Sequence, residues 1–129
     1  MVRKKLLVFV ALAAMSACGP GAPLQLETIQ TGTSLNSDHS VGNHTTRFRP
    51  TDTMNVAILT KGPGAGKISV RWTLGGRVVN EESRAVSYRD SAATEFHLKY
   101  PSGLPAGDYT VEVLIDGKSI GTRNLKVEK

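Results

Sequence analysis

The chain has 129 residues, 40% of them hydrophobic, a formal net charge of +5 and a single cysteine, Cys18. A chain of this length fits one domain, and one cysteine excludes an internal disulfide. Three of the 16 basic residues lie within the first five positions, so 13 basic residues face 11 acidic ones beyond them and the charge there is only +2. This near balance gives no support to nucleic-acid binding.

Positions 1–17 have the three-part layout of a secretory signal peptide. The basic residues Arg3, Lys4 and Lys5 come first, the apolar run Leu6–Met15 follows, and small residues end the segment. The apolar run is about half of the roughly 20 residues that a membrane-spanning helix needs, which argues against a permanent span. We therefore expect residues 1–17 to direct export and to be removed, which leaves 112 of the 129 residues.

The residues Met15-Ser16-Ala17-Cys18 resemble the lipobox of bacterial lipoproteins, whose usual form is Leu-(Ala/Ser)-(Gly/Ala)-Cys. Met15 stands where leucine is commoner, but it is apolar and similar in size. The resemblance implies diacylglycerol on the sulfur of Cys18, cleavage before that residue and acylation of its new amino group. Two or three acyl chains would make a lasting anchor, because each buried methylene contributes about 0.8 kcal/mol.

The same resemblance implies a destination. In enteric-type bacteria an aspartate after the lipidated cysteine favours retention on the inner membrane, and this chain has Gly19 there. We therefore expect an outer-membrane protein facing the periplasm in a Gram-negative host, and a protein on the outer face of the cell membrane in a Gram-positive host. The expected partners are the membrane, through acyl chains on Cys18, and an envelope protein.

Residues 18–47 are rich in Gly, Pro, Ser, Thr and Asn, and their few apolar residues are scattered. Such a segment buries too little apolar surface to offset the entropy lost on ordering. Its composition predicts a flexible tether between the membrane and a domain over residues 48–129. Weak alternation over Leu24–Thr31 leaves open that this stretch joins the sheet as one strand.

From Phe48 onward, apolar and polar residues alternate in short runs, which is typical of half-buried β-strands. The dipeptides Gly75-Gly76 and Asp116-Gly117 predict tight hairpin turns, and Gly121 predicts a bulge. Glu81–Ser91 is polar and irregular, which predicts a short edge strand and a loop. The predicted strands are Met54–Thr60, Ile68–Leu74, Arg77–Asn80, Thr94–Tyr100, Tyr109–Ile115 and Lys118–Glu128.

No segment after the signal peptide has the period of an amphipathic helix, so the fold is predicted to be all-β, an antiparallel sandwich of about seven strands. From about Phe48 to Lys129 the chain resembles immunoglobulin-like and fibronectin type III domains in two places. Trp72 lies in an early strand, where that fold often buries a tryptophan, and Leu104–Tyr109 looks like the turn and tyrosine corner before the penultimate strand. The resemblance implies structural roles for Trp72 and Tyr109, with the Tyr109 hydroxyl bonded to backbone near the turn.

Two motifs match catalytic signatures only formally. Gly62–Lys67 lacks the glycine spacing of a phosphate loop, and Ile68 stands where that loop needs a serine or threonine, so we expect no nucleotide. Gly117–Gly121 matches the nucleophile elbow of hydrolases around Ser119, but it lies in a predicted hairpin, and every histidine precedes it. We expect neither motif to be catalytic.

Metal binding has weak support. Asp38, His39 and His44 lie in the predicted tether and His97 lies on a polar strand face. A specific site needs three or four ligands in fixed geometry, so solvated histidines are the simpler interpretation and we expect no metal or other cofactor. The mixed charges between Glu81 and Asp90 are likewise typical of a solvated loop, although loops on a rigid sandwich are where specific contacts usually occur.

These features favour a non-enzymatic envelope lipoprotein whose immunoglobulin-like domain serves protein interaction or a structural role. The alternative is a glycan- or peptidoglycan-binding module, for which Tyr88 and Tyr100 would have to supply the aromatic platform, because Trp72 is expected in the core. A small hydrolase is a remote alternative, since no nucleophile, base and orienting residue can be assembled.

Overall fold

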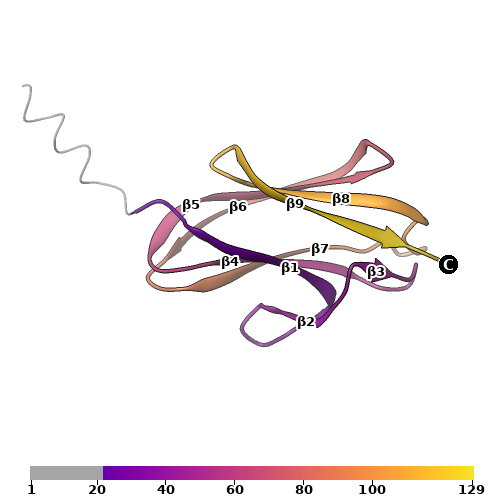
Figure 1. Cartoon of the computed structure of the whole chain (residues 1–129), viewed down its shortest axis with the longest axis horizontal. Helices are drawn as coiled ribbons and strands as arrows, with labels where there is room; N and C mark the ends of the chain where they lie inside the picture. The colour runs from indigo at the N-terminus through magenta and orange to yellow at the C-terminus, as the bar shows by residue number, and fades with distance from the viewer. Residues whose placement is uncertain (1–21) are drawn as a thin grey trace, which may run out of the picture.

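Nine strands form two sheets in the computed structural model, which describes residues 22–129. The four-stranded sheet has the order β2-β1-β4-β7 and the five-stranded sheet the order β3-β9-β8-β5-β6, and the two lie face to face (Figure 1). Neighbouring strands are antiparallel except for β3 and β9. The strands are β1 Leu26–Leu35, β2 Val41–His44, β3 Arg47–Phe48, β4 Met54–Thr60, β5 Gly64–Leu74, β6 Arg77–Tyr88, β7 Ala92–Leu98, β8 Gly107–Ile115 and β9 Lys118–Val127.

The all-β sandwich predicted from the alternating pattern is the observed architecture. Within residues 22–129 there is no helix long and apolar enough to cross a membrane. The signal-peptide, lipidation and sorting predictions for residues 1–17, Cys18 and Gly19 lie outside the described residues.

The core lies between the sheets and is built by the apolar half of each alternating strand. Trp72 is fully buried at the middle of this layer, beside Val70 on the same strand and opposite its ladder partner Val111 on β8. The indole Nε1 of Trp72 has no hydrogen-bond partner among the described residues, so apolar packing alone holds the ring. The four-stranded sheet supplies Val56, Ile58 and Phe96 to the same cluster.

Strand β4 is buried on both faces because the β1–β2 hairpin folds across the outer side of its sheet. The backbone N–H of Val41 donates to Oε1 of Gln30 at 3.0 Å, and Val41 is only 2% exposed. Ala57, which alternates with the core-facing residues of β4, is also fully buried. Figure 1 shows β2 on the side of the four-stranded sheet that faces away from β5 and β8.

The predicted tether over residues 18–47 differs from the structure from Pro23 onward. Pro23 forms a bridge to Ala65, β1 pairs with β4 from Leu26 to Gly32, and β2 adds a further strand. The polar composition misled the prediction because long-range hydrogen bonds stabilise the hairpin beside the burial of a few apolar residues such as Ile29 and Val41: Thr31 Oγ1 donates to the Thr45 carbonyl at 2.8 Å. The strand left open at Leu24–Thr31 overlaps β1, which begins at Leu26 and continues to Leu35.

Both predicted hairpin dipeptides occupy tight turns with positive φ. Gly75 and Gly76 have φ of 58° and 83°, and Asp116 and Gly117 have φ of 51° and 82°, as a type I′ turn requires. The predicted bulge lies beside Gly121, since the register passes from Val113 opposite Gly121 to Leu114 opposite Ser119.

Tyr109 makes the backbone contact of a tyrosine corner. Its hydroxyl donates to the Pro105 carbonyl at 2.6 Å, and the residue is 1% exposed. Burial, with a smaller contribution from Tyr100, raises the pKa of Tyr109 above its ordinary value. The preceding turn is fixed in turn by the Leu104 N–H, which donates to the Pro50 carbonyl at 2.8 Å.

Candidate functional site

The two formal catalytic motifs both lie in hairpins or strands. Gly64–Leu74 is strand β5, so no helix follows the glycine-rich loop. A side chain at Gly64 would approach the Pro23 carbonyl to 2.9 Å, which shows that this glycine admits the incoming N-terminal segment. Ser119 sits in the β8–β9 ladder opposite Leu114, where it has no elbow geometry.

The histidines are dispersed in the described part of the chain. His39 lies in the β1–β2 turn with φ of 73°, His44 ends β2, and His97 lies on β7 with its Nδ1 2.7 Å from Glu95 Oε2. No group of three His, Cys, Asp or Glu side chains within residues 22–129 could hold a metal ion. Asp38 is instead a turn residue, because its Oδ1 accepts from the hydroxyl and the backbone N–H of Ser40. These two bonds lower the pKa of Asp38, the hydroxyl more than the N–H.

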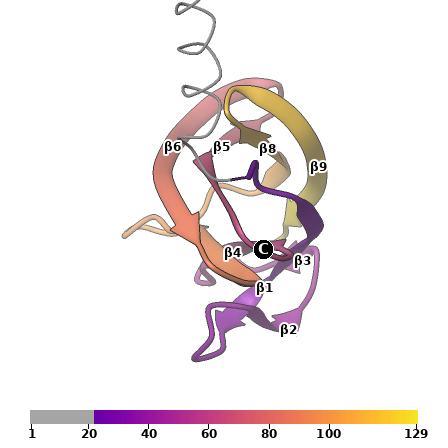
Figure 2. The ribbon, with the colours of Figure 1, turned by 90° about the vertical axis from the view of Figure 1, so that its left-hand side faces the viewer.

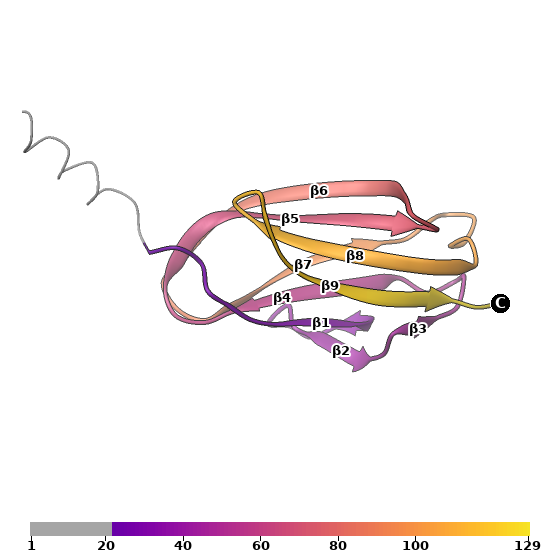
Figure 3. The ribbon, with the colours of Figure 1, turned by 45° about the horizontal axis from the view of Figure 1, so that its top comes forward.

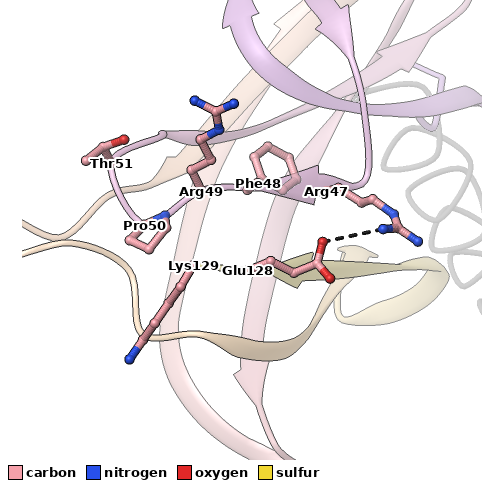
Figure 4. A pocket seen from close by; sticks show the side chains of 7 residues that line it. All are labelled: Arg47, Phe48, Arg49, Pro50, Thr51, Glu128 and Lys129. Carbon is pink, nitrogen blue, oxygen red and sulfur yellow. Dashed lines mark hydrogen bonds and ion pairs between the residues drawn. The ribbon is translucent and has the colours of Figure 1, made fainter.

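A basic cavity of about 510 Å³ lies at the end of the sandwich where β3 and β9 meet. Arg47 there forms an exposed ion pair with Glu128 at 3.4 Å. Figure 4 shows the charged ends of Arg47, Arg49 and Lys129 pointing in three different directions. Three cations that diverge cannot chelate one anion, so this cavity has the charge but not the geometry of an anion site.

The two tyrosines considered as a sugar platform are both half-buried and pack against the core. Tyr88 is further fixed by a hydrogen bond of 2.6 Å between its hydroxyl and Thr94 Oγ1. A flat exposed aromatic face, which stacking on a sugar ring needs, is therefore not formed by Tyr88 or Tyr100.

The most prominent surface feature is the free edge of β6. This strand has 12 residues, pairs with β5 along its whole length, and within residues 22–129 has no neighbour on its other side. Figure 3 shows β6 as the last strand of its sheet, and Figure 2 shows it at the outer margin of the sandwich. An unpaired edge presents a row of free N–H and C=O groups that another strand can bind.

Hydrogen bonds of Lys67 reveal which backbone groups of β6 are free. The Lys67 N–H donates to Asp116 Oδ1 at 2.9 Å and its carbonyl accepts from the Asp116 N–H at 2.8 Å, so both groups of Lys67 face β8. Its ladder partner Ala85 is thus not hydrogen-bonded to it, because backbone groups alternate sides along a strand. By the same alternation, the N–H and C=O of Ser83 and Ala85 face the open edge.

The charged side chains of β6 are divided between its two faces. On the outer face Arg71 Nε lies 3.1 Å from Glu81, and its Nη1 lies 3.0 Å from Glu112 on β8. On the inner face Arg84 lies over the Phe96 ring, 4.5 Å from its centroid, and donates to the Glu95 carbonyl at 2.8 Å. Arg84 therefore occupies one carbonyl of the adjacent edge strand β7, while the edge of β6 stays open.

The sequence pattern predicted a strand at Arg77–Asn80 and a short edge strand with a loop within Glu81–Ser91, and the structure joins the two into one long edge strand. The strand continues to Tyr88 and only Arg89–Ser91 form a connection. The alternation is invisible because the charged residues Glu82 and Arg84 occupy the inner face between the apolar residues, and most of β6 is exposed. The signal that could have found it is the Gly75-Gly76 turn, since the strand that leaves a tight hairpin turn pairs residue by residue with the strand that enters it.

Comparisons with known proteins support the fold and leave the family open. No protein-family model matches the chain and no curated protein is similar to it. The structure resembles an immunoglobulin-like protein from Pseudomonas aeruginosa, at 11% identity and a TM-score of 0.56, over 83% of this chain and 98% of that one. The sandwich is therefore immunoglobulin-like.

Parts of larger proteins have similar structures. One is a Paenibacillus cycloisomaltooligosaccharide glucanotransferase complexed with cycloisomaltoheptaose, at 16% identity and a TM-score of 0.60, over 83% of this chain but 14% of that one. Another is the Pseudomonas fluorescens alkylpurine DNA glycosylase AlkC bound to DNA, at 11% identity and a TM-score of 0.55, over 84% of this chain and 31% of that one. The chain thus spans a small part of these enzymes, and identities this low show the fold alone.

Proposed function

We propose that this chain is a bacterial envelope lipoprotein, anchored through acyl chains on Cys18, whose immunoglobulin-like domain binds protein and catalyses no reaction. The observation that supports protein binding is the unpaired edge of β6, where Ser83 and Ala85 direct backbone donors and acceptors outward. Strand addition at such an edge takes its affinity from main-chain hydrogen bonds and its specificity from the neighbouring side chains. The lipobox resemblance at residues 15–18 supports the anchor.

The start of the sandwich at Ala22 limits how far an anchored domain could lie from the membrane. Ala22 follows Cys18 by four positions, a reach of at most about 14 Å. The Ala22 carbonyl already accepts from the Ala65 N–H at 2.9 Å, so the sandwich begins there. A lipid on Cys18 would hold the end with the start of β5 and the Asp116-Gly117 turn close to the membrane, rather than on a long tether.

The anchor is tested by intact mass and membrane fractionation of the wild type beside Cys18→Ala, both expressed in a bacterial host. We expect the wild type to begin at Cys18, to bear acyl mass and to sediment with membranes, and the variant to lose both properties. A wild-type chain that is soluble and without acyl mass would contradict the anchor and leave a freely secreted binding domain.

The interaction site is tested separately by pulldown from crosslinked cells. Ser83→Pro removes an N–H that faces the open edge, and proline is tolerated on an edge strand where its missing N–H would face solvent. We expect the wild type to retain a protein partner that Ser83→Pro loses. Lys118→Glu, on β9 three strands away from β6 in the same sheet, is the control and should retain it. Equal recovery with all three chains would exclude the β6 edge.

A further inference from the structure

We propose that the partner at the β6 edge is a second copy of this chain, bound antiparallel about a two-fold axis that passes beside Ser83. The pairing would join the two five-stranded sheets into one continuous sheet. This inference rests on the protein-binding part of the proposed function and not on the lipid anchor. Among the sheet edges of the described domain, β6 is the one suited to it, because β2 has four residues, β3 has two, and Arg84 occupies the Glu95 carbonyl of β7.

The backbone of β6 has the pattern that this symmetry needs. The N–H and C=O of Ser83 face the open edge, so two copies of Ser83 placed opposite each other form a hydrogen-bonded pair with themselves. Residues opposite each other in such a pair have Cα atoms about 5.5 Å apart. On either side, Glu81 lies opposite the second copy's Ala85, whose free backbone groups complete the next bonds.

The charges of Glu82 and Arg84 select this register. Their ladder partners Val70 and Ile68 point into the core, so both charged side chains lie on the inner side of β6, two residues apart. A two-fold axis at Ser83 places Glu82 of each copy opposite Arg84 of the other, twice in the dimer. Opposite charges directly across a strand pair stabilise it, and like charges destabilise it.

A shift of the axis by one residue in either direction removes this match. An axis at Glu82 places Glu82 opposite its own copy, and an axis at Arg84 places Arg84 opposite its own copy. Each shift also carries residues to different neighbours along the edge, so the pairing of the middle of β6 is specified by charge. Self-complementarity of this kind is what an isologous two-fold interface requires.

The present contacts of Arg84 are compatible with the dimer. One of its nitrogens donates to the Glu95 carbonyl and the guanidinium lies over Phe96, which fixes the side chain. A guanidinium has five N–H donors, so the remaining ones are free to meet the second copy's Glu82. On the outer face Glu81 is already neutralised by Arg71 and meets only Ala85.

The register is tested by disulfide crosslinking of the full chain with Cys18→Ala, so that no other thiol is present. Ser83→Cys in that background places two thiols opposite each other at a Cα separation that a disulfide spans. We expect diamide to convert it to a dimer that reductant reverses. The matched control Ser87→Cys, on the same strand and face, would lie opposite Val79 and should crosslink much more slowly. Equal rates, or no dimer from Ser83→Cys, would overturn the register.

Charge reversal tests the partner in the same Cys18→Ala chain by sedimentation over a range of concentrations. Glu82→Arg and Arg84→Glu should each raise the dissociation constant of the dimer about tenfold or more, because each creates two like-charge pairs. An equimolar mixture of the two variants should associate again, since each supplies the charge that the other lacks. Restoration by mixing also shows that both variants are folded.

The outcomes separate this inference from the proposed function. A wild-type chain that stays monomeric, reversals without effect, or a mixture that fails to associate would each overturn the dimer. If the monomer is confirmed while Ser83→Pro still loses a different envelope protein in the pulldown, the β6 edge remains the interaction site and the second copy is not its occupant.

Discussion

Strands β4 and β6 have opposite relations to solvent although both are regular antiparallel strands. β4 lies between β1 and β7 in its sheet. The core covers one of its faces and the β1–β2 hairpin the other, and six of its seven residues are buried. β6 has one neighbour, and most of its residues are exposed. The side chains of β4 therefore determine whether the domain folds, whereas those of β6 are free to determine what it binds.

The largest effect should come from truncating β4. Ile58 is fully buried, so Ile58→Ala should lower the free energy of unfolding by about 2–5 kcal/mol. Val78 on β6 is 48% exposed, and Val78→Ala should change it by no more than about 0.5 kcal/mol. Urea unfolding of both variants measures the difference, and similar losses would show that the two strands contribute alike to stability.

A second substitution is designed to displace the β1–β2 hairpin from the outer face of β4. A side chain at Gly32 would collide with the Asn43 carbonyl and would approach the Gly42 carbonyl to 2.6 Å, both of them backbone atoms. Gly32→Ala should therefore displace the hairpin and lower the free energy of unfolding by about 1–3 kcal/mol. Limited proteolysis should cut the hairpin faster in this variant. Thr33→Ala is the control, and the same proteolysis rate in both would contradict the packing argument.

The tyrosine corner allows the contribution of one buried hydroxyl group to stability to be measured. Tyr109→Phe keeps the ring but leaves the Pro105 carbonyl without its donor, which should lower the free energy of unfolding by about 1–2 kcal/mol. Tyr100→Phe is the control, because the Pro105 carbonyl accepts its hydrogen bond from Tyr109 and not from Tyr100. Thermal melts at neutral pH distinguish the two variants, and an equal loss would mean that the corner contributes nothing specific.

The raised pKa of Tyr109 gives this prediction a pH dependence. The folded pKa lies above the unfolded value of about 10, so the stability contributed by the neutral hydroxyl is fully present below that value and is lost as the pH rises through the folded pKa. The stability difference between wild type and Tyr109→Phe should therefore shrink above about pH 10. A difference that grows with pH would contradict the assigned sign.

The sequence predicted the parts of the fold whose signals are local. Alternation located β5, β8 and most of β7, because every second residue of a strand with one face in the core is buried. A dense run of apolar residues located β4, which is buried on both faces. The dipeptides Gly75-Gly76 and Asp116-Gly117 located two turns through their positive φ. These signals need only neighbours along the chain.

The missed parts depend on contacts between distant residues. The β1–β2 hairpin is polar and owes its place to long-range hydrogen bonds such as that of Thr31 to Thr45, so its composition looks like a tether. The candidate site was missed for the same reason, because Arg84 and Glu82 are ordinary surface charges until the register of β6 against β5 puts them on one face. In both places the structure depends on pairing between residues far apart in the sequence, which the pattern of apolar and polar residues along the chain does not show.

The smallest expected effect lies at the tip of the hairpin that covers β4. The Ser40 hydroxyl and N–H lower the pKa of the exposed Asp38 carboxyl. The Ser40 nitrogen lies 3.0 Å from Asp38 Oδ1. A lowered folded pKa means that the stabilisation is present above the unfolded value of about 3.9 and is lost as the pH falls through the folded pKa. Between about pH 6 and pH 3 the melting temperature of wild type should thus fall slightly further than that of Asp38→Asn. Asp52→Asn, at a turn outside the hairpin, is the comparison. If Asp38→Asn and wild type respond equally to pH, the Asp38 turn does not help to hold the hairpin over β4.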